Sequence, residues 1–181
     1  MHRELSLQVA RESIVLLKNA NHLLPLSKTL KSIAVVGPNA NEVKALLGSY
    51  YGTPSVAVTP LVGIRQKVSP GTKVIYAKGC EAVEPPIIAD SLEEAVSAAR
   101  SADVVVAALG LSGDLENEQF EIEEDGFYWG DRTRLDLPTA QEKLLEAVAH
   151  DVAPEVHPAA GKAGLSPKRR PLRPRAGLIA D

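Results

Sequence analysis

Three short apolar runs separated by helical patterns constrain the fold more than any other feature of this 181-residue chain. Residues 32–38 and 72–77 are rich in β-branched side chains, and residues 103–110 are almost free of polar ones. Such runs are typical of strands that are buried on both faces of a sheet. Because they alternate with segments of helical spacing, the sequence predicts an α/β fold with a mostly parallel sheet flanked by helices.

Apolar residues at helical spacing predict helices between these runs. The predicted helices are residues 3–18, 43–47, 61–68, 91–102 and 140–150. Short polar side chains beside their first turns can accept from backbone N–H groups that have no partner within the helix. The expected caps are Asn39 or Asn41, Ser91 in a capping box, and Thr139.

Composition divides the chain into three parts. Residues 1–30 form an initial helix and linker, residues 31–150 a partial α/β domain, and residues 151–181 a tail rich in proline and arginine. The tail has almost no apolar periodicity, so it cannot bury enough surface to offset its ordering entropy, and we predict that it is disordered. Two alternatives are a nucleic-acid-binding tail, carried by the basic run 168–170, and a sequence foreign to this fold.

Charge and residue counts exclude several classes of partner. A net charge of −3 and a pI near 5.8 give no reason to expect nucleic acid or an anionic membrane as partner. No apolar run reaches the roughly 18 to 20 residues of a membrane span, and the first residues lack the apolar core of a signal peptide, so the default expectation is the cytoplasm. The single cysteine, Cys80, is expected to be buried and inert, and the four scattered histidines indicate no metal site. No cofactor is predicted.

The loop after the third apolar run is the strongest functional signal in the sequence. Between residues 114 and 129 it holds seven carboxylates and four aromatic rings: Asp114, Glu116, Glu118, Glu121, Glu123, Glu124 and Asp125, with Phe120, Phe127, Tyr128 and Trp129. Aromatic rings stack on the apolar faces of sugars, and a carboxyl group among other acids can keep its proton at neutral pH. In α/β sheets, ligands bind where loops leave the carboxyl ends of strands, as this loop does. A solvated acidic loop is the alternative.

The turn after the first apolar run, residues 35–40, offers a weaker signal. A strand, a Gly-Pro turn and a helix could cradle a phosphate, and a nucleotide-binding sensor is one reading of it. The segment lacks the spacing of either common phosphate-binding motif, and Pro38 removes one backbone donor. A purely structural turn is favoured.

Several segments resemble, in order, the second, α/β-sandwich domain of family 3 glycoside hydrolases. The matching segments are residues 11–19, 23–26, 33–40, 47–52, 58–61, 79–80, 110–111, 130–132 and 137–138. Together they cover roughly residues 2 to 150, and the match fails in the tail. The family contains β-glucosidases and β-xylosidases, most of which are retaining enzymes.

The resemblance implies a division of labour between two domains. In the family, a preceding (β/α) barrel carries the nucleophilic aspartate, and the sandwich domain supplies a general acid/base glutamate. Glu118 fits that glutamate best and Glu116 is the alternative, while Asp131 and Arg132 suggest an ion pair that anchors the return of the loop. A chain that lacks the barrel is expected to be inactive alone.

The partners implied are a β-linked glucoside or xyloside and a possible separate barrel chain. A different class of function is a non-catalytic carbohydrate-binding or interaction module. In both cases the rings of Phe127, Tyr128 and Trp129 are the expected sugar contacts.

Overall fold

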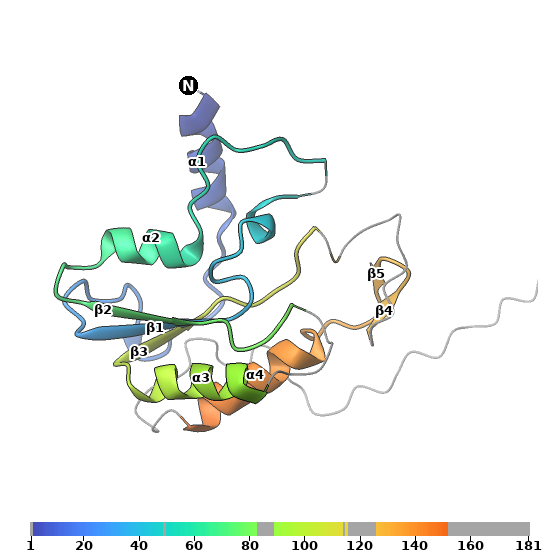
Figure 1. Cartoon of the computed structure of the whole chain (residues 1–181). Coiled ribbons are helices and arrows are strands. Elements are labelled where there is room, and N and C mark those ends of the chain that lie inside the picture. The colour runs from blue at the N-terminus through green and yellow to red at the C-terminus, as the bar shows by residue number, and fades with distance from the viewer. Residues whose placement is uncertain (1, 49, 83–88, 114, 116–125, 152–181) are drawn as a thin grey trace, which may run out of the picture.

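Three parallel strands form the central sheet of the protein. The computed structural model describes residues 2–48, 50–82, 89–113, 115 and 126–151. The strands are β1 (Ser32–Val36), β2 (Lys73–Ala77) and β3 (Val104–Ala107), in the order β2-β1-β3. Both pairings are parallel. The predicted α/β class, with a parallel sheet flanked by helices, is confirmed (Figure 1).

Helices cover both faces of the sheet. Helix α2 (Pro60–Lys67) lies on one face, and helices α3 (Ala89–Arg100) and α4 (Thr139–Asp151) lie on the other (Figure 1). Successive side chains of a strand point to opposite faces. Ile33 and Val35 accordingly pack toward α2, whereas Ala34 and Val36 pack toward α3 and α4. Burial on both sides explains why the central strand has no polar residue after Ser32.

The helix ends differ from those predicted. The segment around residue 45 is only a 3-10 turn, η2 (Lys44–Leu46), with no side-chain cap. Asn41 instead accepts a hydrogen bond from the Thr59 hydroxyl, and Thr59 itself caps α2. The expected caps Ser91 and Thr139 are wrong as well, because α3 begins at Ala89 and α4 already includes Thr139. At the start of α2, the contact between Thr59 and Asn41 joins segments 18 residues apart, which sequence spacing does not encode.

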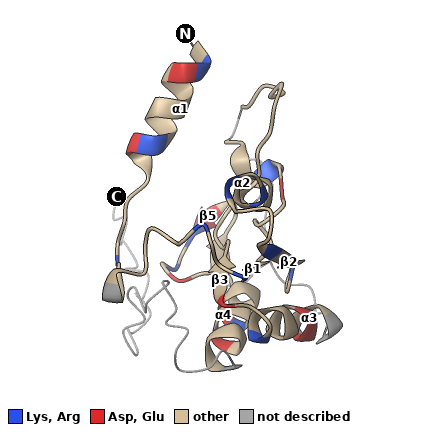
Figure 2. Cartoon of the chain, turned by 90° about the vertical axis from the view of Figure 1, so that its left-hand side faces the viewer, with Lys and Arg blue, Asp and Glu red and all other residues tan. Residues whose placement is uncertain are grey.

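Helix α1 (His2–Ser13) stands apart from the sheet and is shorter than the predicted 3–18 (Figure 2). Every residue of the helix is exposed, and the β-branched pair that follows Ser13 favours extended backbone over helix. The apolar segment 14–17 is left 61–79% exposed. The only other helical element before β1 is the single turn η1 (Ala20–His22) among the described residues.

Within the described ranges, no helix has both the length and the apolar character needed to cross a bilayer. Apart from Asp151, which ends α4, the predicted disordered tail lies outside the described residues. The three domain boundaries inferred from composition remain predictions.

Candidate functional site

Three loops leave the carboxyl ends of the strands and are tied together by backbone hydrogen bonds. The Gly37 amide, just after β1, donates to the Lys78 carbonyl after β2 at 3.1 Å. The Asn39 amide donates to the Ala108 carbonyl after β3 at 3.2 Å. These bonds join the three loops at one edge of the sheet, and the acidic loop, which contains residues 114–129, follows β3 there.

The turn after β1 is structural rather than phosphate-binding. Besides the bonds of Gly37 and Asn39, the Ala40 amide donates to the Gly37 carbonyl at 3.2 Å, and Pro38 has no N–H. All four positions of the turn are therefore unable to offer an amide to a phosphate. Gly37 has φ +110, and a Cβ placed there would lie 2.3 Å from the Ala108 carbonyl oxygen.

A buried glutamine holds the start of the acidic loop. Gln141, at the start of α4, has no exposed surface. Its Oε1 accepts from the Gly110 amide at 2.7 Å, and its Nε2 donates to the carbonyls of Ala82, at 2.7 Å, and Gly110, at 3.0 Å. Our sequence reasoning missed this residue, because glutamine on a helix is usually exposed. The available signal is its spacing from Leu144 and Val148, which places it on the buried stripe of α4.

The predicted acid/base residues Glu116 and Glu118 lie outside the described residues. The chain on the way to them is described as far as Gly113, together with Leu115. Leu115 is 7% exposed, and its amide donates to the Ser112 carbonyl at 2.9 Å. The loop is therefore anchored in the protein one residue before Glu116.

The three rings predicted to contact sugar have different environments. Phe127 and Tyr128 form β4 (Phe127–Tyr128), which pairs with β5 (Asp131–Arg132) in an antiparallel hairpin. Tyr128 is 69% exposed, and Trp129, at the hairpin turn with φ 54, is 53% exposed. Phe127 is half-buried, with the Arg132 guanidinium 4.4 Å from its ring centre. Tyr128 and Trp129 are thus the accessible rings of the hairpin.

The predicted pair of Asp131 and Arg132 has a different partner in the structure. Arg132 Nη2 donates to the Asp136 carbonyl oxygen, and the Asp136 carboxylate lies 3.8 Å from that nitrogen and 3.4 Å from Arg134 Nε. Asp131 is exposed. Neighbours on a strand point to opposite faces, so these two adjacent side chains diverge. Arg132 does hold the returning chain, but through Asp136, and the expected pairing is wrong.

Two side chains near the site have shifted ionisation. Burial, with a smaller contribution from Asp136, raises the pKa of Glu142, the residue after Gln141. Burial also raises the pKa of the Cys80 thiol to about 11, so the thiol stays protonated and unreactive at neutral pH. In the part of the chain that the structure describes, no three His, Cys, Asp or Glu side chains gather as a metal site would require.

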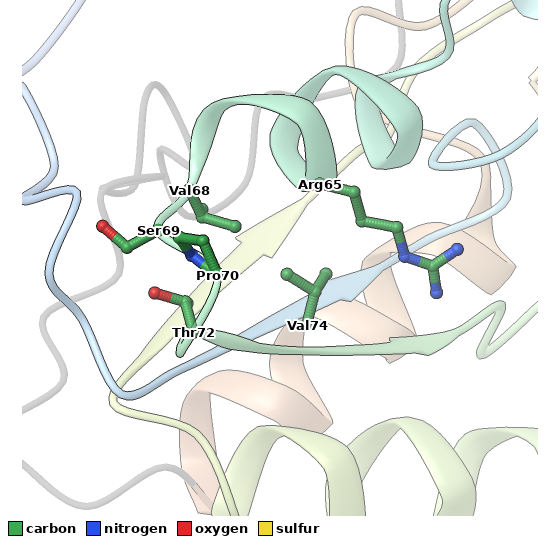
Figure 3. A pocket seen from close by; sticks show the side chains of 6 residues that line it. All are labelled: Arg65, Val68, Ser69, Pro70, Thr72 and Val74. Carbon is green, nitrogen blue, oxygen red and sulfur yellow. The ribbon is translucent and has the colours of Figure 1, made fainter.

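A depression of about 370 Å³ lies elsewhere, beside the last turn of α2. Its walls are formed by Arg65, Val68, Ser69, Pro70, Thr72 and Val74 (Figure 3). Thr72 and Val74 flank the first residue of β2, at the opposite end of the sheet from the tied loops. Ligands of parallel sheets bind at the carboxyl ends of the strands, so we do not assign this depression to the site.

A parallel sheet with helices on both faces, and with tied loops at the carboxyl ends of its strands, defines an α/β domain. The profile of the "Glycosyl hydrolase family 3 C-terminal domain" matches residues 14–160. The chain belongs to glycoside hydrolase family 3 and corresponds to its C-terminal domain, as the resemblance in the sequence indicated.

Similar proteins include β-xylosidases and β-glucosidases. The chain is 40% identical over 154 residues to a β-xylosidase of Formosa agariphila, covering 81% of this chain and 20% of that protein. It is 37% identical over 149 residues to β-D-xylosidase 3 of Arabidopsis thaliana, covering 82% of this chain and 17% of that protein. The crystal structure of a family 3 β-glucosidase from Bifidobacterium adolescentis matches with a TM-score of 0.68 and 36% identity, over 83% of this chain and 20% of that one. The chain therefore spans about a fifth of the length of these relatives.

Proposed function

We propose that this chain supplies the general acid/base carboxylate of a retaining β-glycosidase, with Glu118 in that role and Glu116 as the alternative. The observation that carries the proposal is the acidic loop itself, which leaves the tied carboxyl edge of the sheet in a chain of family 3. Gln141 and Leu115 hold the start of this loop in place.

The proposed reaction has two steps and needs two carboxyl groups. In the first step, the protonated glutamate gives its proton to the glycosidic oxygen, the bond from that oxygen to the anomeric carbon breaks, and a carboxylate nucleophile forms an ester to that carbon. In the second step, the now ionised glutamate removes a proton from water, water attacks the anomeric carbon, and the ester breaks. The family resemblance places the nucleophile on a (β/α) barrel, so this chain alone is expected to be inactive.

The proposed substrates are β-linked xylosides or glucosides. Relatives with similar sequences and structures are named β-xylosidases and β-glucosidases. The exposed rings of Tyr128 and Trp129 are suited to stack on a sugar ring. The ring of Phe127 is less accessible, because the Arg132 guanidinium lies over it.

The proposed docking surface for the barrel is the exposed segment 14–17. Four consecutive apolar side chains, Ile14, Val15, Leu16 and Leu17, are 61–79% exposed, and the apolar residues of α1 before them are also uncovered. An exposed apolar patch of this kind is typical of an interaction surface. Packing against the barrel would remove this surface from water.

Reconstitution with a barrel tests the proposal. We expect the purified chain, mixed with a separately produced (β/α) barrel of a family 3 β-xylosidase, to hydrolyse aryl β-xylosides, while neither component alone does so. The measurement is release of the phenol, followed by absorbance. Hydrolysis by the chain alone, or no hydrolysis by the mixture at saturating barrel, would contradict the proposal.

A charge in the docking segment should weaken this reconstitution. Leu17→Asp places a carboxylate in the proposed interface, and we expect the barrel concentration for half-maximal activity to rise at least tenfold. Ser97→Asp makes a similar change on the exposed face of α3 and serves as the matched control. Equal behaviour of the two variants would remove the docking surface from the proposal.

The alternative function, a non-catalytic carbohydrate-binding module, is favoured by the exposure of Trp129, the single tryptophan of the chain. It predicts that millimolar xylose, glucose or cellobiose quenches the tryptophan fluorescence. Tyr128→Ala should reduce the quenching by removing the neighbouring ring, whereas Tyr51→Ala, which removes another exposed tyrosine, should leave it unchanged. A flat titration with all three sugars speaks against this function.

A further inference from the structure

Gln141 does more than fill the core: we infer that it is a positioning residue for the acid/base loop. Its amide holds the first residues of that loop against the loop after β2 and thereby sets the direction in which the chain leaves β3 toward the proposed acid/base residue. This inference rests on the proposed function and deepens it.

The side-chain amide of Gln141 makes three hydrogen bonds, and two of them are to the same residue, Gly110. Both hydrogens of Nε2 are used, one on the Ala82 carbonyl and one on the Gly110 carbonyl, while Oε1 accepts from the Gly110 amide. The side-chain amide of Gln141 is thus hydrogen-bonded to both the N–H and the C=O of Gly110. Two bonds to one residue restrain the orientation of the peptide groups on both sides of it, which a single bond does not.

Gly110 is where the chain turns from β3 toward the acidic residues. It has φ +143, a conformation that L side chains rarely adopt, and it precedes Glu116 by six residues in the sequence. Leu115, which follows Gly110 in the sequence and comes just before Glu116, is buried and forms the second anchor. A change in backbone direction at Gly110 would change the direction of the chain that leads to Glu116 and Glu118. Small displacements of a catalytic group strongly reduce the reaction rate.

A purely apolar role for position 141 does not account for these contacts. Leu144 and Val148 share the buried stripe of α4 and fill it with aliphatic side chains. An aliphatic residue at 141 would leave the Gly110 N–H and two carbonyl groups of this part-buried region without their present partner, and leaving such groups unpaired costs free energy. The side chain of Gln141 therefore bonds to the two loops as well as filling space in the core.

Leaving-group dependence in the reconstituted enzyme separates positioning from folding. A displaced general acid slows the departure of a poor leaving group, which needs a proton, more than that of a good one. We expect Gln141→Leu to raise the ratio of kcat/KM for 2,4-dinitrophenyl β-xyloside to kcat/KM for phenyl β-xyloside at least tenfold, because kcat/KM reports the first step and not the second step, which is common to both substrates. A variant that is merely less folded lowers both rates by one factor. Gln66→Leu, on the exposed side of α2, is the matched control and should keep the wild-type ratio.

Gln141→Glu adds a pH-dependent test. A protonated carboxyl group can accept from the Gly110 amide and donate to one carbonyl, but an ionised one faces two carbonyl oxygens. Its pKa in the folded protein should therefore exceed the unfolded value of about 4.3. The stability that the protonated form contributes is fully present below that pH and is lost as pH rises through the folded pKa. The ratio of the kcat/KM values should be near wild type at pH 5 and rise toward pH 7, without a similar change in Gln66→Leu.

Hydrogen exchange in the full 181-residue chain gives a readout that does not depend on activity. Gln141→Leu should speed exchange of the Gly110 and Leu115 amides at least tenfold, while the amide of Val35 in the central strand keeps its protection. Unchanged exchange at Gly110, or an active mixture with an unchanged ratio of kcat/KM values, overturns the inference and leaves the proposed function intact. A wild-type mixture without activity overturns the proposed function, and with it the catalytic part of this inference, whatever the exchange shows.

Discussion

Replacing Gly37 by alanine should lower the free energy of unfolding by about 3 kcal/mol or more, because two costs combine at this position. Gly37 has φ +110, and the added Cβ would lie 2.3 Å from the Ala108 carbonyl oxygen and 3.0 Å from its carbon. Both atoms are backbone at the end of β3, so no side chain can move aside. Relief of the clash would separate the turn after β1 from the loop after β3.

Urea denaturation followed by circular dichroism measures this change, and the melting temperature should fall on the order of 10 °C. Gly71→Ala is the matched control, because no atom lies within 4 Å of the Cβ it would add and its φ is not positive. That variant should differ from wild type by less than about 1 kcal/mol. Equal stability of the two variants would show that the close approach at Gly37 is not a feature of the folded protein.

Glu118→Gln should lower kcat of the reconstituted enzyme by about 10²- to 10⁴-fold for phenyl β-xyloside, because glutamine cannot protonate the leaving oxygen. The first step with 2,4-dinitrophenyl β-xyloside needs no such proton and should be much less affected. The second step still lacks a base to deprotonate water. Added azide, a nucleophile that needs no base, should therefore restore turnover of the dinitrophenyl substrate and yield the glycosyl azide.

Comparison with two other glutamates tests whether Glu118 is the acid/base residue. If Glu116→Gln shows the azide rescue and Glu118→Gln does not, Glu116 carries the role. Glu94→Gln, on the exposed face of α3, is the control for loss of a carboxylate and should behave as wild type. If neither loop variant depends on leaving group or azide, the acid/base assignment to this loop is wrong.

The fold class could be predicted because the central strand is buried on both faces and therefore shows an unbroken apolar run. The three sheet-flanking helices α2, α3 and α4 were found for a related reason, since each buries one apolar stripe against the sheet. The predicted helix 3–18 was only partly right. Its apolar spacing continues past Ser13, but no described residue covers it, so packing does not extend the helix.

The sequence did not show which residues are bonded to one another at the site. Adjacent residues Asp131 and Arg132 suggested a pair, but strand geometry separates them, and Arg132 bonds to Asp136. The role of Gln141 depends on carbonyl and amide groups 31 and 59 residues away in the chain. No local pattern records which distant backbone groups a side chain will meet, because that depends on how the sheet and helices pack.

The amino-acid sequence by itself determined the parallel α/β architecture, the family and the acidic loop after the third strand, because apolar periodicity and segment order are properties of the chain. Only the tertiary structure decided that the backbone amides of the turn at Gly37 are all used within the protein and cannot bind an anion. It also decided that Tyr128 and Trp129 are the accessible rings, and that Gln141 is hydrogen-bonded to Gly110. These features depend on which backbone groups find hydrogen-bond partners and which side chains stay exposed when the sheet and helices pack. Contacts between segments far apart in the chain determine both.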